Sequence, residues 1–229
     1  IAPYVENNIG QAQKTAKVPA KFNLFNFSIT YQLYLPKGYT SKRHYPLIIL
    51  LHGAGRTGKS VVERWKDLAD EVGLILVGPN AYNKHWMDQT YRKVHMNLIE
   101  QIVKDVSQAL SINQSRIYLF GHSNGGMFAS VLPYHKPDLF AAIAIHAGTL
   151  PNTYADKMIQ AKNKPPMLLQ IGTRDTVFPL DHVSNSAQIL AASGYETKLE
   201  IYQGHNHWYY TLAPQINRNA LAFLLKYKK

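Results

Sequence analysis

The chain has 229 residues, of which 46% are hydrophobic and 17% are charged, so it is long enough for one globular domain and too apolar to be disordered. It contains no cysteine, which excludes disulfides, iron–sulfur clusters and thiolate metal sites. The formal net charge is +11, but Lys and Arg are spread from Lys14 to Lys229, which indicates a basic solvated surface rather than a protein that binds nucleic acid.

Hydrophobic periodicity predicts strands that alternate with helices after a polar, irregular arm over residues 1–27. Strands are predicted at 28–36, 45–53, 73–79, 116–121, 139–148, 165–172 and 197–204, and helices at 59–72, 94–110, 125–135, 182–193 and 213–229. This alternation indicates an α/β fold with a mostly parallel central sheet. We therefore expect a single catalytic α/β domain over 28–229. Only a short polar segment separates the strands near 148 and 165, so we expect no large cap.

The first motif in chain order follows the strand at 45–53. Gly53–Ser60 reads GAGRTGKS and matches the phosphate-binding P-loop pattern G-x-x-x-x-G-K-S/T. A P-loop NTPase also needs a buried strand that ends in an Asp for Mg²⁺, and none of the predicted strands ends in this way. We therefore expect no nucleotide ligand, and we interpret Lys59 and Ser60 as the beginning of a helix.

The strongest motif lies between the strand at 116–121 and the helix after it. Gly121, Ser123 and Gly125 form G-x-S-x-G within RIYLFGHSNGG, the pattern of a nucleophile elbow. Such a serine lies on a sharp, strained turn, and side chains two residues away on either side would clash. The helix that follows would direct its first N–H groups toward negative charge near the serine. Ser123 is therefore the predicted nucleophile, and the alternative is a glycine-rich turn that closes the sheet.

A serine nucleophile requires a base, and the base requires an acid that orients it. In a nucleophile-elbow enzyme the chain order is Ser, then Asp or Glu, then His. Asp175 directly follows the buried strand at 165–172 and is the predicted acid, in preference to Asp156 in a polar loop or Asp181 in a helix.

Two histidines, His205 and His207, follow the last predicted strand and are both candidates for the base. A His-x-His pair is also a possible metal-ligand pair, but its position after a strand end favours the catalytic reading. The segment HGAGRTG is interpreted as an oxyanion loop. The backbone N–H groups of Ala54 and Asn124 are its predicted donors, and His52 is expected to hold the loop by hydrogen bonds.

Several segments together resemble the α/β-hydrolase esterases of the polyhydroxybutyrate depolymerase and feruloyl esterase type. They read LHGAGRTG, WKDLADEVGLILVGPNA, INQSRIYLFGHSNGGMFASVL, PDLFAAIAIHAG and GTRDTVFP. The HGAGRTG loop is also similar to that of the phospholipase/carboxylesterase branch. The resemblance covers the chain from about Tyr31 to the C-terminus. It implies an α/β-hydrolase fold that hydrolyses carboxylic esters through an acyl-enzyme, without a cofactor.

In such esterases the loop that carries the base often reads Y-x-G-x-G-H. The base then lies five residues after the aromatic residue, which here is Tyr202, and the resemblance therefore favours His207. Asn206 stands where this pattern has its second glycine, and the competing register G-H-x-x-W selects His205. The resemblance also carries over Ser123 as nucleophile, Asp175 as acid, and the Ala54 and Asn124 N–H groups as oxyanion donors.

Aromatic residues near the predicted site are candidates for a substrate pocket. Trp86, Phe178 and Trp208, with His205 beside them, would suit apolar or aromatic acyl groups, and the alternative is that they only pack the sheet edge. The expected partner is a small or polymeric ester. A peptidase or acyltransferase with the same triad, or a silent binding protein of the same fold, are the competing functions.

The sequence gives little information about the compartment. No apolar run approaches the ~18 residues that a membrane span requires, so we expect none. The chain begins at Ile1, which fits a processed N-terminus or a trimmed chain. We therefore favour a secreted or periplasmic location over a cytoplasmic one, without a sequence feature that decides it.

Overall fold

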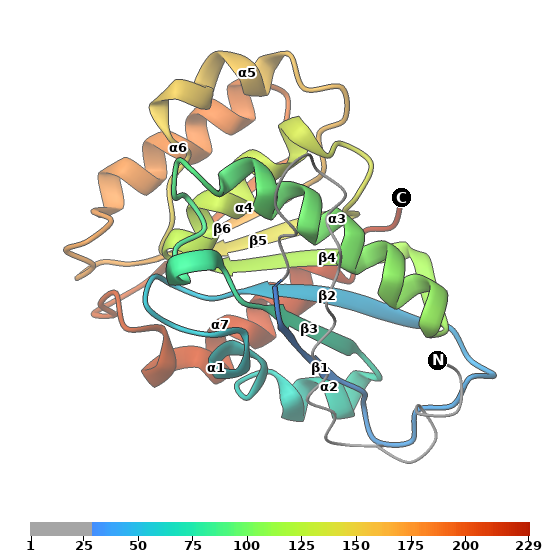
Figure 1. Ribbon diagram of the computed structural model, residues 1–229. Coiled ribbons are helices and arrows are strands. Elements are labelled where there is room, and N and C mark those ends of the chain that lie inside the picture. The colour runs from blue at the N-terminus through green and yellow to red at the C-terminus, as the bar shows by residue number, and fades with distance from the viewer. Residues whose placement is uncertain (1–28) are drawn as a thin grey trace.

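The computed structural model describes residues 29–229, so the predicted arm at 1–27 lies outside the described residues. One seven-stranded sheet runs through the middle of the molecule (Figure 1). Its strands, in chain order, are β1 Tyr31–Tyr34, β2 Tyr45–Leu51, β3 Ile75–Pro79, β4 Ile112–His122, β5 Ala142–His146, β6 Met167–Gly172 and β7 Thr197–Tyr202. The spatial order is β1-β3-β2-β4-β5-β6-β7. Only β1 is antiparallel to its neighbour, so the predicted mostly parallel sheet is confirmed.

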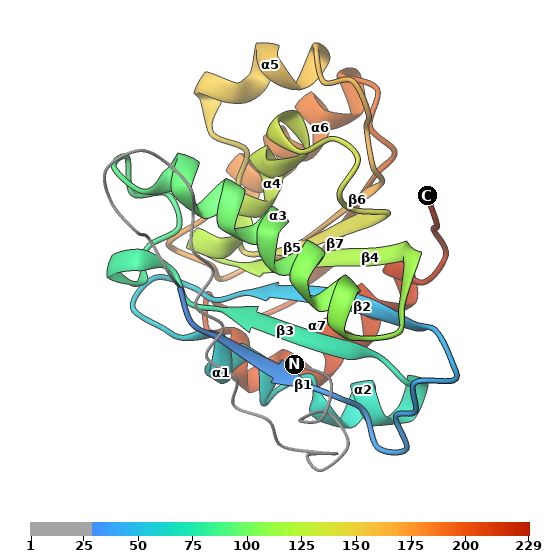
Figure 2. The same ribbon diagram turned by 45° about the vertical axis from the view of Figure 1, so that its right-hand side comes forward.

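Helices cover both faces of this sheet (Figures 1 and 2). One face carries α3 Arg92–Ala109, α4 Asn124–His135, α5 Ala155–Ile159 and α6 Leu180–Ala192, and the other carries α1 Gly58–Val62, α2 Lys66–Val72 and α7 Tyr209–Leu224. Two 3₁₀ turns, η2 Tyr82–Lys84 and η3 Asn152–Tyr154, complete the described elements. The connection from β5 to β6 holds only η3 and α5, so no large cap is inserted there.

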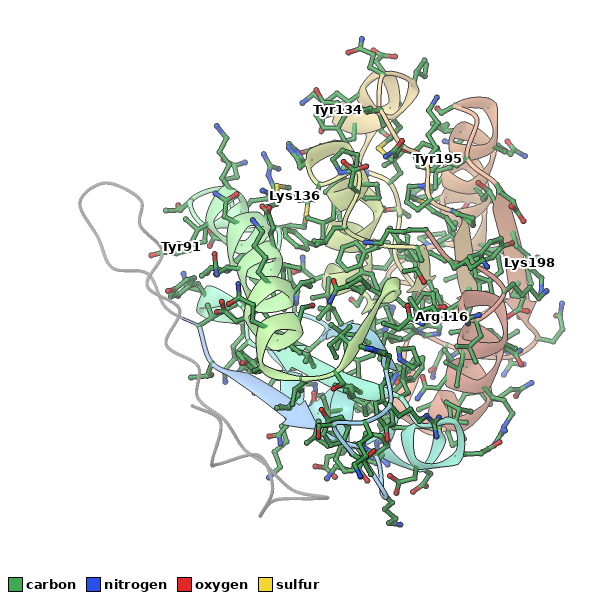
Figure 3. The ribbon with its side chains drawn as sticks, turned by 90° about the vertical axis from the view of Figure 1, so that its right-hand side faces the viewer. Tyr91, Arg116, Tyr134, Lys136, Tyr195 and Lys198 are labelled. Atoms are coloured by element: carbon green, nitrogen blue, oxygen red, sulfur yellow. The ribbon has the colours of Figure 1, made fainter. Side chains whose placement is uncertain are left out.

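The alternation of side chains along the strands produces two separate cores. Ile49 and Leu119 belong to the core under α3 and α4, whereas their neighbours Ile48 and Phe120 belong to the core against α2 and α7. Because helices cover both faces, the central strands are apolar at nearly every position. Figure 3 shows the side chains that fill these two layers, and Arg116 beside α7, where its guanidinium donates to the Leu225 carbonyl oxygen at 3.2 Å.

The prediction of a single helix over 59–72 is wrong, because the structure has two shorter helices separated by residues 63–65. The break brings Trp65 into the core, where its indole N–H donates to the Tyr209 hydroxyl at 3.1 Å. The carbonyl oxygen of Arg64 accepts a hydrogen bond from the Asn217 amide at 2.8 Å. The two residues of each pair are about 150 positions apart in the sequence, so local periodicity does not predict these contacts.

Candidate active site

Three polar side chains meet at the edge of the sheet where the parallel strands have their carboxyl ends. Ser123 follows β4, Asp175 follows β6 and His207 follows β7. The Nε2 atom of His207 lies 2.9 Å from Ser123 Oγ, and its Nδ1 atom lies 2.9 Å from Asp175 Oδ2. The imidazole of His207 therefore bridges the hydroxyl and the carboxylate.

The turn at Ser123 has the strain expected of a nucleophile elbow. The backbone φ and ψ angles of Ser123 are 56° and −121°, outside the regions that residues other than glycine favour. The flanking glycines are needed for close approach. A Cβ on Gly121 would lie 2.3 Å from the Gly125 carbonyl oxygen, and a Cβ on Gly125 would lie 2.6 Å from the Leu51 carbonyl oxygen. Both distances are well below van der Waals contact, so neither position accommodates a larger residue without a backbone shift.

Asp175 is held as a charged acceptor for His207. Burial alone would raise the pKa of this carboxyl, but hydrogen bonds from His207, Phe178 and Val177 outweigh burial and lower the pKa below its ordinary value. The backbone N–H groups of Val177 and Phe178 donate to Oδ1 at 2.9 and 2.8 Å, which leaves Oδ2 for the imidazole. An ionised Asp175 accepts from Nδ1–H of His207, so Nε2 has a free lone pair toward the Ser123 hydroxyl.

His52 fixes the loop beside Ser123, as the sequence predicted for it. Its Nε2 atom accepts from the Ala81 N–H at 3.1 Å, so its Nδ1 carries the proton and donates to the Gly53 carbonyl oxygen at 2.8 Å. Burial lowers the pKa of His52 to about 4 and keeps the ring neutral. Gly53 lies against the serine, since a Cβ on it would be 3.4 Å from Ser123 Cβ. The loop that carries Ala54 therefore begins against the serine.

Asn124 begins α4, and the N–H of a first helical residue has no acceptor within its own helix. The side chain of Asn124 has a role that sequence reasoning missed. Oδ1 accepts from the Trp86 N–H at 2.6 Å and from the Met87 N–H at 3.4 Å, and Nδ2 lies 3.2 Å from His85 Nε2. The residue after Ser123 thus anchors the loop at 85–87.

The four candidate pocket residues have different surroundings. Trp86 is fully buried, and its indole N–H donates to the His52 carbonyl oxygen at 3.0 Å, so it supports the loop and does not line an open pocket. The half-buried Phe178 ring lies 5.6 Å from the His207 ring. Trp208 is 44% exposed beside His207. His205 is buried with its ring 5.4 Å from that of His146, so it lies outside the bridge between Ser123 and Asp175.

A cluster of buried histidines lies behind the site and was also missed. Nδ1 of His122 lies 3.0 Å from Nδ1 of His146, and the His122 ring is 5.2 Å from that of His207. Burial lowers the pKa of His122 to about 3 and that of His146 well below its ordinary value, so both are neutral at pH 7. Their position at the ends of the buried strands β4 and β5 was the available signal, but their pairing is not readable from one sequence.

The segment that matches the P-loop pattern is used for packing. The N–H of Gly58 donates to the Asn80 side chain at 2.8 Å, and a Cβ at Gly58 would lie 1.8 Å from the Gly78 carbonyl oxygen. The glycine that the pattern requires therefore allows α1 to approach β3 closely.

Comparison with known families extends these observations. Residues 83–216 match the family described as phospholipase/carboxylesterase. The chain belongs to that family. This phospholipase/carboxylesterase family member is 31% identical over 128 residues to a poly(3-hydroxybutyrate) depolymerase of Ralstonia pickettii, a match that covers 47% of this chain and 26% of the relative. It is 30% identical over 159 residues to a probable feruloyl esterase C of Aspergillus terreus, covering 66% of this chain and 56% of the relative.

The solved structure of a thermostable esterase superposes on this family member with a TM-score of 0.76 at 21% identity, over 96% of this chain and 63% of that one. The likeness establishes the α/β-hydrolase fold, as the resemblance implied. The chain spans about half or less of the length of the two relatives. Within residues 29–229, none of the helices has the length and apolar character needed to cross a bilayer.

Proposed function

We propose that this protein is a serine carboxylic-ester hydrolase that works through an acyl-enzyme. The observation that carries the proposal is the His207 imidazole, which lies 2.9 Å from both Ser123 Oγ and Asp175 Oδ2. A bridge of this kind activates a serine hydroxyl, because the ring nitrogen that faces the hydroxyl is free to accept its proton. The family membership and the esterase names of the relatives agree with this chemistry.

In the first half of the reaction, Ser123 Oγ attacks the ester carbonyl carbon while His207 Nε2 takes the hydroxyl proton. The carbonyl oxygen becomes an oxyanion, which the N–H groups of Ala54 and Asn124 stabilise by donating to it. The C–O bond to the alcohol then breaks, and the protonated His207 gives its proton to the leaving alkoxide. The products of this half are the free alcohol and a Ser123 ester of the acid.

In the second half, His207 takes a proton from water, and the hydroxide so formed attacks the acyl carbon. The second oxyanion uses the same two N–H groups, and its collapse expels Ser123 Oγ, which recovers its proton from His207. Asp175 stays ionised throughout and stabilises the imidazolium that forms in each half. No cofactor takes part in these steps. The hydrogen bond from the Gly58 N–H to the Asn80 side chain supports a structural rather than a nucleotide-binding role for the GAGRTGKS segment.

The proposed substrates are esters of small acids or of hydroxy acids. The half-buried Phe178 ring beside His207 offers an aromatic wall to an acyl group. The names of the two relatives make hydroxycinnamate esters and polyesters of 3-hydroxybutyrate the first compounds to compare with simple nitrophenyl esters.

The experiment compares the parent protein with Ser123→Ala and a matched Ser184→Ala control on this panel of esters. Ser184 lies on α6, where its hydroxyl donates to the Leu180 carbonyl oxygen at 2.8 Å. We expect Ser123→Ala to lower kcat by about 10⁴-fold or more, and the control to keep parental turnover. A folded Ser123→Ala protein with near-parental ester turnover would show that another group performs the chemistry.

A further inference from the structure

A hollow of about 500 Å³ has Trp208, the residue after His207, in its wall, and the mechanism above does not use it. Its walls come from the end of the HGAGRTG segment, from α1 and the two residues that follow it, and from the start of α7. They include three basic and two aromatic side chains, namely Arg56, Lys59, Arg64, Trp208 and Tyr210.

Two residues of the wall are close in the sequence to residues of the proposed site. Trp208 directly follows His207, and Arg56 is two residues beyond Ala54, so the walls begin within one or two Cα–Cα steps of about 3.8 Å from the site. His207 must give its proton to the leaving oxygen, which therefore lies beside its Nε2 atom. An alcohol half that extends past His207 on the Trp208 side would reach this hollow.

The aromatic rings contact two of the three cationic side chains at the walls of the hollow, Arg56 and Arg64. The Arg56 guanidinium carbon lies 4.7 Å from the centre of the Trp208 ring and 5.6 Å from that of Tyr210. The Arg64 guanidinium carbon lies 5.7 Å from the Tyr210 ring centre on the same side. Stacked in this way, a guanidinium keeps its N–H edges available for an anion.

The positive charge of the hollow is not neutralised by its own wall. Glu63, the carboxylate at the wall, forms an ion pair with Lys66 at 2.7 Å, and Lys66 lies outside the wall. Among residues 29–229, no carboxylate lies within salt-bridge distance of Arg56, Lys59 or Arg64. Three cations thus face a space large enough for part of a substrate.

We propose that this hollow, the basic alcohol-side pocket, binds a carboxylate carried by the alcohol half of the ester. The inference rests on the proposed esterase function and adds a substrate class to it, namely esters whose leaving alcohol is a hydroxy acid or a sugar acid. The planar guanidinium groups match the two oxygens of a carboxylate, and Trp208, 44% exposed, offers an apolar face to the rest of the alcohol.

The test uses two aryl acetates that differ only in charge, 3-acetoxybenzoate and 3-acetoxybenzamide. The measured quantity is the ratio of their kcat/KM values, so that any difference in intrinsic reactivity cancels between parent and variant. We expect Arg56→Gln and Arg64→Gln each to lower the ratio of carboxylate to carboxamide about two- to fivefold, as for partly exposed ion pairs. Lys162→Gln, which removes an exposed lysine between α5 and β6, is the charge-matched control and should keep the parental ratio.

Salt and direct binding provide independent measurements. Raising the ionic strength from 0.15 M, where the screening length is about 8 Å, to 1 M, where it is about 3 Å, should lower the parental ratio. Calorimetric titration with the product 3-hydroxybenzoate requires no turnover and should show weaker binding in both Arg56→Gln and Arg64→Gln. Two further substrates identify the source of the carboxylate. If kcat/KM for the 3-hydroxybutyrate dimer falls in Arg56→Gln, the carboxylate comes from a hydroxy acid. If kcat/KM for acetylated galacturonic acid falls in Arg56→Gln, the carboxylate comes from a sugar acid.

The outcomes separate the pocket from the esterase function. If the parent turns over both aryl acetates but the ratio and the calorimetric affinity are unchanged in both arginine variants, the pocket is refuted and the esterase proposal stands. If the parent turns over neither compound, nor any ester of the wider panel, the esterase proposal fails and the pocket fails with it.

Discussion

The buried histidines predict that acid destabilises the protein well above the pH at which carboxylates titrate. Burial lowers the pKa of six histidines, namely His52, His95, His122, His135, His146 and His205. In the unfolded chain these rings titrate near a pKa of about 6.5. Below that pH the unfolded state binds more protons than the folded state, so the free energy of unfolding falls as the pH falls.

The size of the effect follows from two of these rings. The pKa of His52 is about 4 and that of His122 about 3 in the folded protein. Between pH 6.5 and 4 each ring removes about 1.4 kcal/mol of unfolding free energy per pH unit, so the loss at pH 5 is about 2 kcal/mol per ring. Together these two rings remove about 4 kcal/mol, a large part of the roughly 5–15 kcal/mol typical of a folded domain.

The assay is urea unfolding of the parent at pH 7.5, 6 and 5, followed by tryptophan fluorescence. Replacing a buried ring by a neutral amide, as in His146→Gln, should lower stability at pH 7.5 but make the loss between pH 7.5 and 5 smaller. Replacing the exposed His182 by Gln is the matched control and should leave that loss as in the parent. Equal unfolding free energies for the parent at pH 7.5 and pH 5 would refute the reasoning.

Three further substitutions test the site itself. His207→Ala should lower kcat for ester hydrolysis by several orders of magnitude. His205→Ala removes a ring outside the bridge and should change kcat far less. Equal losses of kcat in the two variants, measured by steady-state kinetics, would contradict the assignment of the base. Gly125→Ala places a Cβ about 2.6 Å from the Leu51 carbonyl oxygen, so it should lower the Tm and the activity together, and a variant with parental Tm and kcat would mean that the elbow has room.

The parts of the site that were predictable are those with a local signal. The sharp turn at Ser123 requires small flanking residues, and Asp175 lies three residues after the end of a buried strand, so both positions can be read from short segments. The sheet was predictable for the same reason, because strands covered on both faces form continuous apolar runs. The choice of His207 over His205 needed the spacing from Tyr202 and a resemblance to known esterases.

The remaining features depend on contacts between distant parts of the chain. The pair of His122 and His146 joins two neighbouring strands, and the amide of Asn124 anchors a loop almost 40 residues earlier. At the break after α1, Trp65 donates a hydrogen bond to Tyr209 at the start of α7. No periodicity or motif encodes such partners. The same limit applies to Trp86, which is fully buried and donates its indole N–H to the His52 carbonyl oxygen.

The central claim is that Ser123 is the nucleophile and carries the acyl group of a covalent acyl-enzyme. Covalent labelling tests this claim most directly. The measurement is the intact mass of the protein after reaction with a fluorophosphonate, followed by peptide mapping. The account predicts one adduct, located on Ser123, which is absent from Ser123→Ala and greatly slowed in His207→Ala. Labelling that persists in Ser123→Ala, or a folded parent protein that remains unlabelled, would contradict the account.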